Sequence, residues 1–145
     1  MGDVDEQRVV TVDSTGVIRS WGREWQSAVG YTADEAVGQR IDLVIPSALH
    51  MRHWRGFNTA IEDGRLQHDD GSGSWTLRTV ATHKDGQLVP LRAVLELTSD
   101  ADGAVNGAKG TILGRAPGWM VPIARVGLAA LRLGQSVRGR SGKSS

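Results

Sequence analysis

The side chains best suited to metal chemistry in this chain are two of its four histidines. His50 and His53 lie three residues apart in a segment, residues 48–63, that is predicted to be helical, so they occupy neighbouring positions on one side of it. A neutral imidazole is the commonest metal ligand among side chains. Zinc is disfavoured, because no third or fourth ligand stands at a fitting spacing. The pair alone predicts either a single-imidazole metal site or two ordinary exposed histidines.

Composition limits the other chemistry that the chain can supply. It has 145 residues and no cysteine, which excludes disulfides, iron–sulfur clusters and thiolate zinc sites. No nucleophile–base pair or carboxylate dyad is visible in the sequence, so hydrolysis by side chains alone is not expected. No apolar run is long enough for a transmembrane segment, and the acidic N-terminus lacks the apolar core of a signal peptide. We therefore expect a cytoplasmic protein.

The elements that must position the histidines follow from turn and capping signals. Thr32, with Glu35 three residues later, forms a capping-box pattern, and Gly64 is placed to end the histidine-bearing helix. Two Asp-Gly pairs favour tight hairpins between the later strands. The expected order is strands 9–13 and 17–21, helices 24–29, 33–37 and 48–63, and strands 75–83, 88–97 and 105–113. This order predicts an α+β fold, a five-stranded antiparallel sheet with short helices on one face.

The chain is expected to hold one domain. Residues 1–8 form an N-terminal segment, residues 9–117 the domain, and residues 118–145 a basic C-terminal segment with a helix at 120–137 and a disordered tail. Five Lys or Arg and no acid lie in that last segment. The helix would pack on the sheet or on a second subunit, with contact to a membrane surface as the alternative. Nucleic-acid binding is not expected, because aromatic stacking residues do not accompany the charges.

Three stretches resemble the PAS domain family. They are VDSTGVIRSW at residues 12–21, GYTADEAVGQ at 30–39 and KDG at 84–86. A sharper resemblance lies in IPSALHMRH at 45–53, which is similar to haem-binding PAS sensors of the FixL and direct-oxygen-sensor kind. There, a histidine seven residues after the proline ligates iron. The resemblance implies a haem b held by His53, with His50 as the fallback ligand, in a slot between helix and sheet.

The same resemblance assigns positions on the opposite side of that haem. Leu77 falls where the oxygen sensors carry an arginine, and Trp75 where some carry a methionine ligand. Ala93 and Leu95 fall at positions that crowd the bound ligand, and Ala93 is small, which implies a roomier pocket. Strand alternation predicts that Trp75 and Leu77 share one face of the sheet. Without the arginine, oxygen sensing would need an indole N–H of Trp75 or Trp54 as the donor, although Trp75 and Leu77 could equally be plain core residues.

A haem propionate or an anionic substrate would also need a cationic side chain near the pocket. Arg65 or His68, in the polar loop before residue 75, could meet a haem propionate or an anionic substrate. Arg78, Arg92 and Lys109 could do the same, or could simply be solvated.

The resemblance implies two functions for a stand-alone haem domain. Single-domain haem PAS proteins of similar layout act as N-nitroglycine lyases, which break a nitramine into nitrite, ammonia and glyoxylate. The short extent of chain beyond the domain, with no output domain, favours this activity. The alternative is a sensor of O₂, CO, NO or redox state that signals to a separate partner, and a PAS domain without haem is a third possibility. A small-molecule ligand or substrate and a homodimer are the partners that the family implies.

Overall fold

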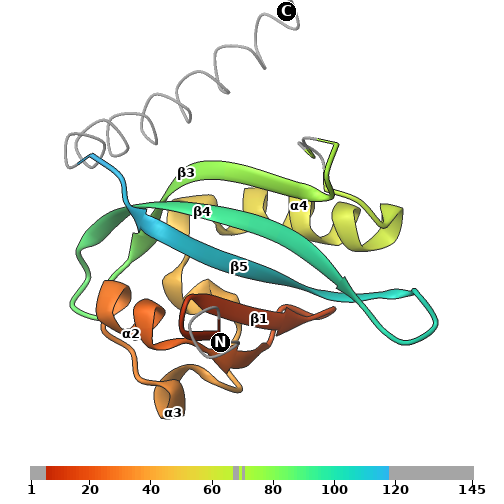
Figure 1. Ribbon diagram of the computed structural model, residues 1–145. Helices are drawn as coiled ribbons and strands as arrows, with labels where there is room; N and C mark the ends of the chain where they lie inside the picture. The colour runs from red at the N-terminus through yellow and green to blue at the C-terminus, as the bar shows by residue number, and fades with distance from the viewer. Residues whose placement is uncertain (1–5, 67–68, 70, 118–145) are drawn as a thin grey trace, which may run out of the picture.

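The computed structural model describes residues 6–66, 69 and 71–117, and its elements follow the predicted order (Figure 1). The strands are β1 (Val9–Asp13), β2 (Ile18–Trp21), β3 (Ser74–Thr82), β4 (Leu88–Ser99) and β5 (Val105–Arg115). The helices are α2 (Arg23–Val29), α3 (Ala33–Ala36) and α4 (His50–Asp63), with 3₁₀ helices η1 (Ile41–Val44) and η2 (Ser47–Leu49). The helix predicted at 120–137 and the loop residue His68 lie outside the described residues.

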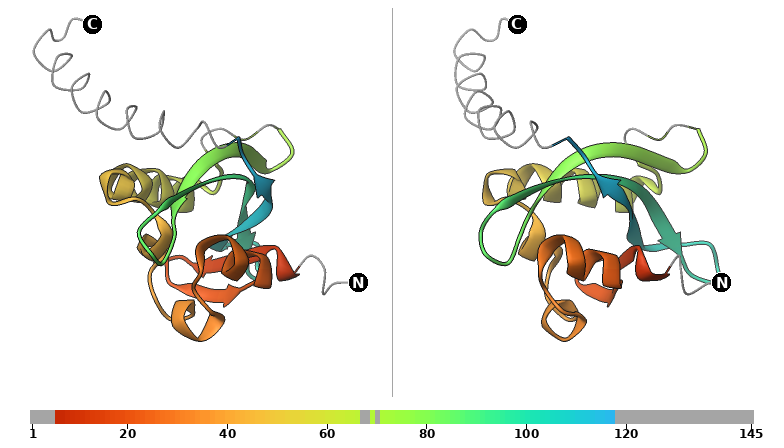
Figure 2. Two further views of the ribbon diagram at one scale, coloured as in Figure 1. Left: turned by 90° about the vertical axis from the view of Figure 1, so that its left-hand side faces the viewer. Right: turned by 60° about the vertical axis from the view of Figure 1, so that its left-hand side comes forward.

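The five strands form one antiparallel sheet in the order β2-β1-β5-β4-β3. Its two outer strands are therefore the second and third along the chain, and the three helices fill the connection between them. Figures 1 and 2 show these helices on one side of a strongly curved sheet. The α+β class and the five-stranded antiparallel sheet predicted from the sequence are confirmed.

Part of the hydrophobic core lies where β1, β2, α2 and α3 meet. Ile18, Val29 and Ala36 are fully buried there, and the rings of Trp21 and Trp25 pack at a tilt of 39°, with 5.9 Å between their centroids. Each indole N–H donates to a backbone carbonyl, because a buried donor without a partner would be costly. The indoles thus bury a large apolar area without leaving their N–H groups unpaired.

Local signals in the sequence explain how the short helices begin and end. Thr32 and Glu35 form the predicted capping box: Glu35 N donates to Thr32 Oγ1 at 3.2 Å and Thr32 N donates to Glu35 Oε1 at 2.9 Å. Gly64 ends α4 at a φ of +75°, a conformation that glycine adopts without strain. The prediction that one helix runs through 48–63 was wrong at its start. Leu49 N donates to the carbonyl of Pro46 at 2.8 Å, which makes that turn a separate 3₁₀ helix.

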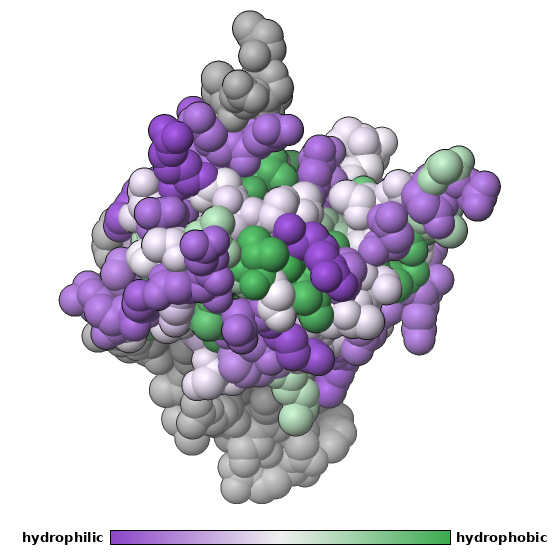
Figure 3. All heavy atoms as spheres, turned by 90° about the horizontal axis from the view of Figure 1, so that it is seen from below, coloured by the Kyte–Doolittle hydropathy of each residue, from purple (hydrophilic) through white to green (hydrophobic). Residues whose placement is uncertain are grey.

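Most of the surface carries polar side chains. Figure 3, a view from below, shows a mainly hydrophilic or neutral face with small, separate apolar patches. Among the described residues, the exposed large apolar side chains are Val37, Met51 and Leu113. In the described part of the chain, no helix is long and apolar enough to cross a membrane.

Candidate functional site

His53 lies on the side of α4 that faces the interior. Its imidazole is half-buried and packs against two aromatic rings that also contact each other, edge-on to Trp54 at 4.9 Å and stacked on Phe57 at 6.0 Å between centroids. Burial lowers its pKa below the ordinary 6.5, the carboxylate of Asp42 opposes this, and His50 adds to it. The ring is therefore neutral at neutral pH. Its Nδ1 is buried and has no hydrogen-bond partner among the described residues.

His50 is placed differently from His53. Its Nε2 lies 2.7 Å from the carbonyl oxygen of Ile45, and since a carbonyl can only accept, Nε2 carries the hydrogen. His50 therefore has one nitrogen engaged in holding the turn before α4. This distinguishes the two imidazoles that the sequence left as alternatives.

Trp54 packs against the turn between β1 and β2. A Cβ added to Gly16 would lie 2.1 Å from Cη2 of Trp54, so the indole occupies the space that only a glycine leaves there. The guanidinium of Arg40 covers the ring at 4.3 Å from its centroid. Trp54 thus fastens α4 to the β1–β2 turn, and its predicted role as a hydrogen-bond donor to a ligand stays a prediction.

The strand positions singled out by the sequence come together on the inner face of the sheet. Trp75 pairs with Leu95, and Leu77 pairs with Ala93, directly across β3 and β4. The prediction that these side chains share a face is confirmed. Ala93 is buried, at 2% exposed, whereas Trp75, Leu77 and Leu95 remain half-buried. Leu91, also on β4, is fully buried, so the half-buried side chains lie toward the start of β3 and the later part of β4.

The candidate cations are not on this face. Arg78 and Arg92 are directly opposite each other on β3 and β4 and alternate with the inner residues, so both are exposed on the outer face. Lys109, also on the outer face, lies 3.6 Å from Glu96. Arg65 is exposed just beyond the end of α4. Of the two alternatives for Arg78, Arg92 and Lys109, the structure supports solvated surface residues.

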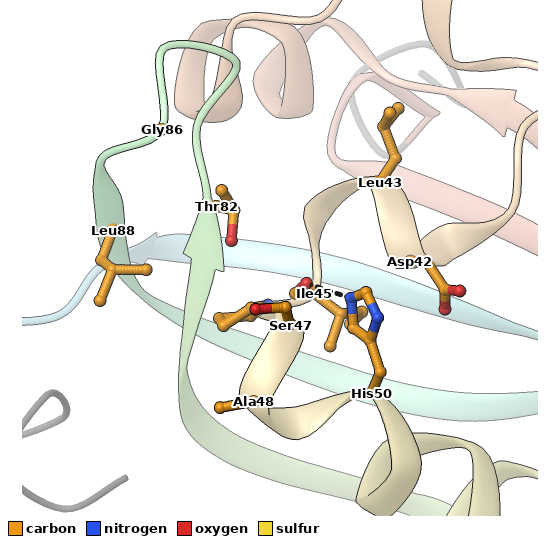
Figure 4. Close-up of a pocket in the computed structure, with 10 residues that line it drawn as sticks. Asp42, Leu43, Ile45, Ser47, Ala48, His50, Thr82, Gly86 and Leu88 are labelled. Carbon is orange, nitrogen blue, oxygen red and sulfur yellow. Dashed lines mark hydrogen bonds between the residues drawn. The ribbon is translucent and has the colours of Figure 1, made fainter. Parts of the chain in front are cut away.

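A cavity of about 390 Å³ lies between the start of α4 and the end of the β3–β4 hairpin (Figure 4), and we call it the hairpin cavity. Its lining residues are Asp42, Leu43, Ile45, Pro46, Ser47, Ala48, His50, Thr82, Gly86 and Leu88. Sequence reasoning missed this cavity, because it forms only when two distant segments fold together. The one available signal was Asp42, a lone acid inside the apolar run at 41–45.

The hairpin that closes this cavity is fixed to the α2–α3 region. Lys84 N donates to the carbonyl of Val29 at 2.8 Å, and the Lys84 ammonium pairs with the carboxylate of Glu35. That pairing, with the capping bonds to Thr32, lowers the pKa of Glu35 below its ordinary 4.5. The cavity wall is thus held from two sides.

No protein-family model matches the sequence, and no curated protein matches it. Solved structures do. A PAS domain from Colwellia psychrerythraea superposes with a TM-score of 0.60 at 21% identity, over 73% of this chain and 83% of that one. The chain has the fold of a PAS domain.

Two further PAS domains of known structure were solved with small molecules. The quorum-sensing receptor RpfR domain of Cronobacter turicensis, in complex with C12:0, has a TM-score of 0.51 at 16% identity and covers 72% of this chain and 91% of that one. A domain of a LuxR-family regulator from Burkholderia thailandensis, in complex with ethanol, has a TM-score of 0.51 at 13% identity, with coverage of 72% and 87%. At these identities, the likeness establishes the PAS fold.

His53, with its neighbours Trp54 and Phe57, has features that would suit a haem. A neutral imidazole is the form that ligates iron, and the buried Nδ1 of His53 is not committed to another described group. The half-buried Leu77, Leu95 and Phe57 offer apolar surface suited to a flat apolar macrocycle. Among the described residues no cluster of three or more metal-binding side chains occurs.

Proposed function

We propose that this PAS domain binds haem b through His53 and uses the haem to bind a small, uncharged ligand. The observation that carries the proposal is the half-buried, neutral imidazole of His53, which has no hydrogen bond to another described residue at its buried Nδ1. A haem iron would bind Nε2, the ring nitrogen remote from the main chain, and would fix the tautomer that carries its hydrogen on Nδ1.

The inner face of the sheet would form the other wall of the haem site. Leu77, Ala93 and Leu95 present only carbon atoms there, and they would contact the porphyrin or its ligand. A bound haem supplies an iron atom to which gases and nitrogen oxides can bind. The protein's own contribution would be a single imidazole ligand, an apolar wall and exclusion of water.

The charges around this face favour an uncharged ligand over an anionic substrate. Arg78, Arg92 and Lys109 face away from it. A nitramine such as N-nitroglycine carries a carboxylate, whose burial without a cation would be strongly unfavourable. A gas or redox ligand needs no such partner. The N-nitroglycine lyase is the second candidate, supported by the small side chain of Ala93, and it would require Arg65 or His68 to hold the carboxylate.

Hemin titration tests the proposal. The purified protein should take up one equivalent of hemin and show a Soret band that shifts on reduction with dithionite. His53→Ala should abolish stable uptake, because no other imidazole is equally free. His50→Ala is the matched control and should retain uptake. A wild-type protein that takes up no hemin, or equal uptake by His53→Ala, would contradict the proposal.

A second assay distinguishes the gas or redox sensor from the N-nitroglycine lyase. Reduced protein mixed anaerobically with carbon monoxide should give the spectrum of a carbonyl complex. If the lyase proposal holds, the same protein mixed with N-nitroglycine should release nitrite in excess of enzyme, and Arg65→Ala should reduce that release. Nitrite release no higher than in a buffer control would exclude the lyase and leave the gas or redox sensor as the haem function.

A further inference from the structure

The two edges of the sheet differ in whether other parts of the chain cover them. The free edge of β2 is occupied, because Ile18 N donates to the carbonyl of Gln39 at 2.8 Å and Gly38 N donates to the carbonyl of Ile18 at 2.9 Å. β2 is also only four residues long, and its pairing with β1 is interrupted by a register shift. Short strands, irregular pairing and covering loops are the usual ways in which proteins protect a sheet edge. This edge is therefore closed to another strand.

The opposite edge, formed by β3, lacks these protections in the described part of the chain. β3 is nine residues long and pairs with β4 in one continuous register (Figure 1). His83 N donates to the carbonyl of Gln87 at 2.7 Å, which fixes the alternation of hydrogen bonds along the ladder. The odd-numbered residues of β3 therefore bond to β4, and the backbone groups of Thr76, Arg78 and Val80 point away from it. Among the described residues, no hydrogen bond reaches these groups.

The same three residues carry their side chains on the outer face of the sheet. They alternate with Leu77 and Ala81, which lie on the inner face, and the side chains of Thr76 and Arg78 are exposed. A strand added at this edge would therefore place alternate side chains next to Thr76, Arg78 and Val80 on the outer face.

Charge is balanced in one cross-strand row of the outer face and unbalanced in another. In the row that begins at Ser74, Glu96 of β4 lies 3.6 Å from Lys109 of β5. In the row that begins at Arg78, Arg92 stands directly opposite, and neither arginine has an acidic partner among the described residues. Like charges directly across a pair of strands are destabilising. An acid on the open side of Arg78 would offset this repulsion.

Neither edge strand of this chain carries such an acid. Arg78 is the one charged residue of β3, and Arg19 is the one charged residue of β2. A second copy that paired through either of these strands would bring an arginine and no acid. Charge complementarity therefore favours a different protein as the partner.

We propose that the β3 edge binds an extended acidic segment of a partner protein, which adds to the sheet as a sixth strand. Its backbone exchanges hydrogen bonds with Thr76, Arg78 and Val80, and a carboxylate on its outer face pairs with the guanidinium of Arg78. The partner residues two positions to either side of that acid lie next to Thr76 and Val80, where a β-branched side chain fits. Binding uses the strand edge and the outer face, so it needs no haem.

A palindromic peptide tests this on the haem-free, full-length protein, because its central residue stays central in either strand direction. Fluorescence anisotropy compares labelled GSVTETVSG with GSVTKTVSG, in which lysine replaces the central glutamate. The glutamate peptide should bind about tenfold more tightly, since its central side chain lies next to Arg78. GSPTETPSG keeps the acid but loses two amide hydrogens of the ladder, so it should bind about tenfold more weakly than GSVTETVSG. Equal binding of either control peptide, or no binding of GSVTETVSG at millimolar concentration, would overturn the proposal.

Variants of Arg78 test the charge pairing. Arg78→Gln should weaken binding of the glutamate peptide about tenfold and remove its advantage over the lysine peptide. Arg23→Gln removes the same charge from an exposed position on α2 and should leave binding unchanged. Arg78→Glu should reverse the preference, so that the lysine peptide binds more tightly. Equal losses in Arg78→Gln and Arg23→Gln would mean a general charge effect and would overturn the assignment.

Val80→Pro tests the edge itself and the alternative occupant. Proline removes an N–H that points away from β4, so the ladder with β4 is kept and the circular dichroism spectrum should not change. Peptide binding should fall about fivefold, and gel filtration should give the wild-type elution volume. Unchanged peptide binding would overturn the proposal. A wild-type dimer that this variant converts to a monomer would do so too, because the edge would then belong to a second copy. His53→Ala should bind the peptide like the wild type, so this proposal and the haem proposal fail separately.

Discussion

The two halves of the sheet are covered by helices in different ways. Where β1 and β2 meet α2, Ile18 and Val29 are fully buried, and the indoles of Trp21 and Trp25 have partners for their N–H groups. Where β3 and β4 run past α4, Leu91 and Ala93 are buried as well, but His53, Phe57, Leu77 and Leu95 remain half-buried. The two sides share one core. We call the β1–β2 side the closed half and the β3–β4 side, where some apolar side chains keep exposed surface, the open half.

This difference suggests that the two halves contribute differently to stability and to binding. The closed half supplies stability, since buried apolar area is the main favourable term in folding. The open half carries the features suited to binding, namely the uncommitted imidazole of His53 and the hairpin cavity. Trp54 and Lys84 connect the halves, one through the contact with Gly16 and the other through Glu35.

The largest loss of stability is expected from a substitution in the closed half. Trp21→Ala removes a buried indole and leaves a cavity, so the free energy of unfolding should fall by about 3–5 kcal/mol. Leu77→Ala in the open half should cost less than about 2 kcal/mol, because that side chain is only half-buried. Urea unfolding of both variants measures the two values. Equal losses would contradict the proposed difference between the halves.

A smaller effect, the difference in stability between two glycine variants, tests the connection between the halves. Gly16→Ala forces an alanine into a φ of +85° and against Trp54, so it should cost more than the 1–3 kcal/mol typical of backbone strain alone. Gly103→Ala is the matched control, because Gly103 has the same φ and nothing within 4 Å of an added Cβ. The difference between the two variants in thermal or urea unfolding measures the Trp54 contact. If they are equally destabilised, Trp54 does not hold the halves together.

The smallest effect concerns the haem-free open half. His53 has a pKa below 6.5 in the folded protein and about 6.5 when unfolded, so below that pH the unfolded state holds more protons. The free energy of unfolding should therefore fall as the pH drops through 6.5 towards the lower, folded pKa. His53→Gln should flatten this part of the curve, as measured by urea unfolding across that pH range. Parallel curves for wild type and variant would mean that burial does not act on His53.

Much of the fold was predictable from local chemistry. The Thr32–Glu35 capping box, the helix end at Gly64 and the shared face of Trp75 and Leu77 each depend on residues close in sequence, and each is confirmed. The extra length of β4, to Ser99, was not predictable, because its end is set by pairing with Val105 on β5. Local signals define elements, whereas strand lengths depend on the partner.

The candidate site was only partly predictable. The proline spacing drew attention to His53, but its burial depends on Trp54 and Phe57 and on the sheet beyond them. The hairpin cavity could not be foreseen, since it joins Asp42 to Thr82 and Leu88 across some forty residues of chain. Alternation along β3 and β4 places Arg78 and Arg92 outside, yet only the structure shows which face the helices cover. The homodimer and the C-terminal helix stay predictions.

Hydrogen exchange with and without hemin tests most directly whether the open half is the ligand side. If hemin binds through His53 between α4 and the sheet, amide exchange should slow most in α4, β3 and β4, and little in β1, β2 and α2. The same experiment on His53→Ala should show no slowing. Slowing centred on β1, β2 and α2, or hemin uptake without slower exchange in α4, would contradict the account.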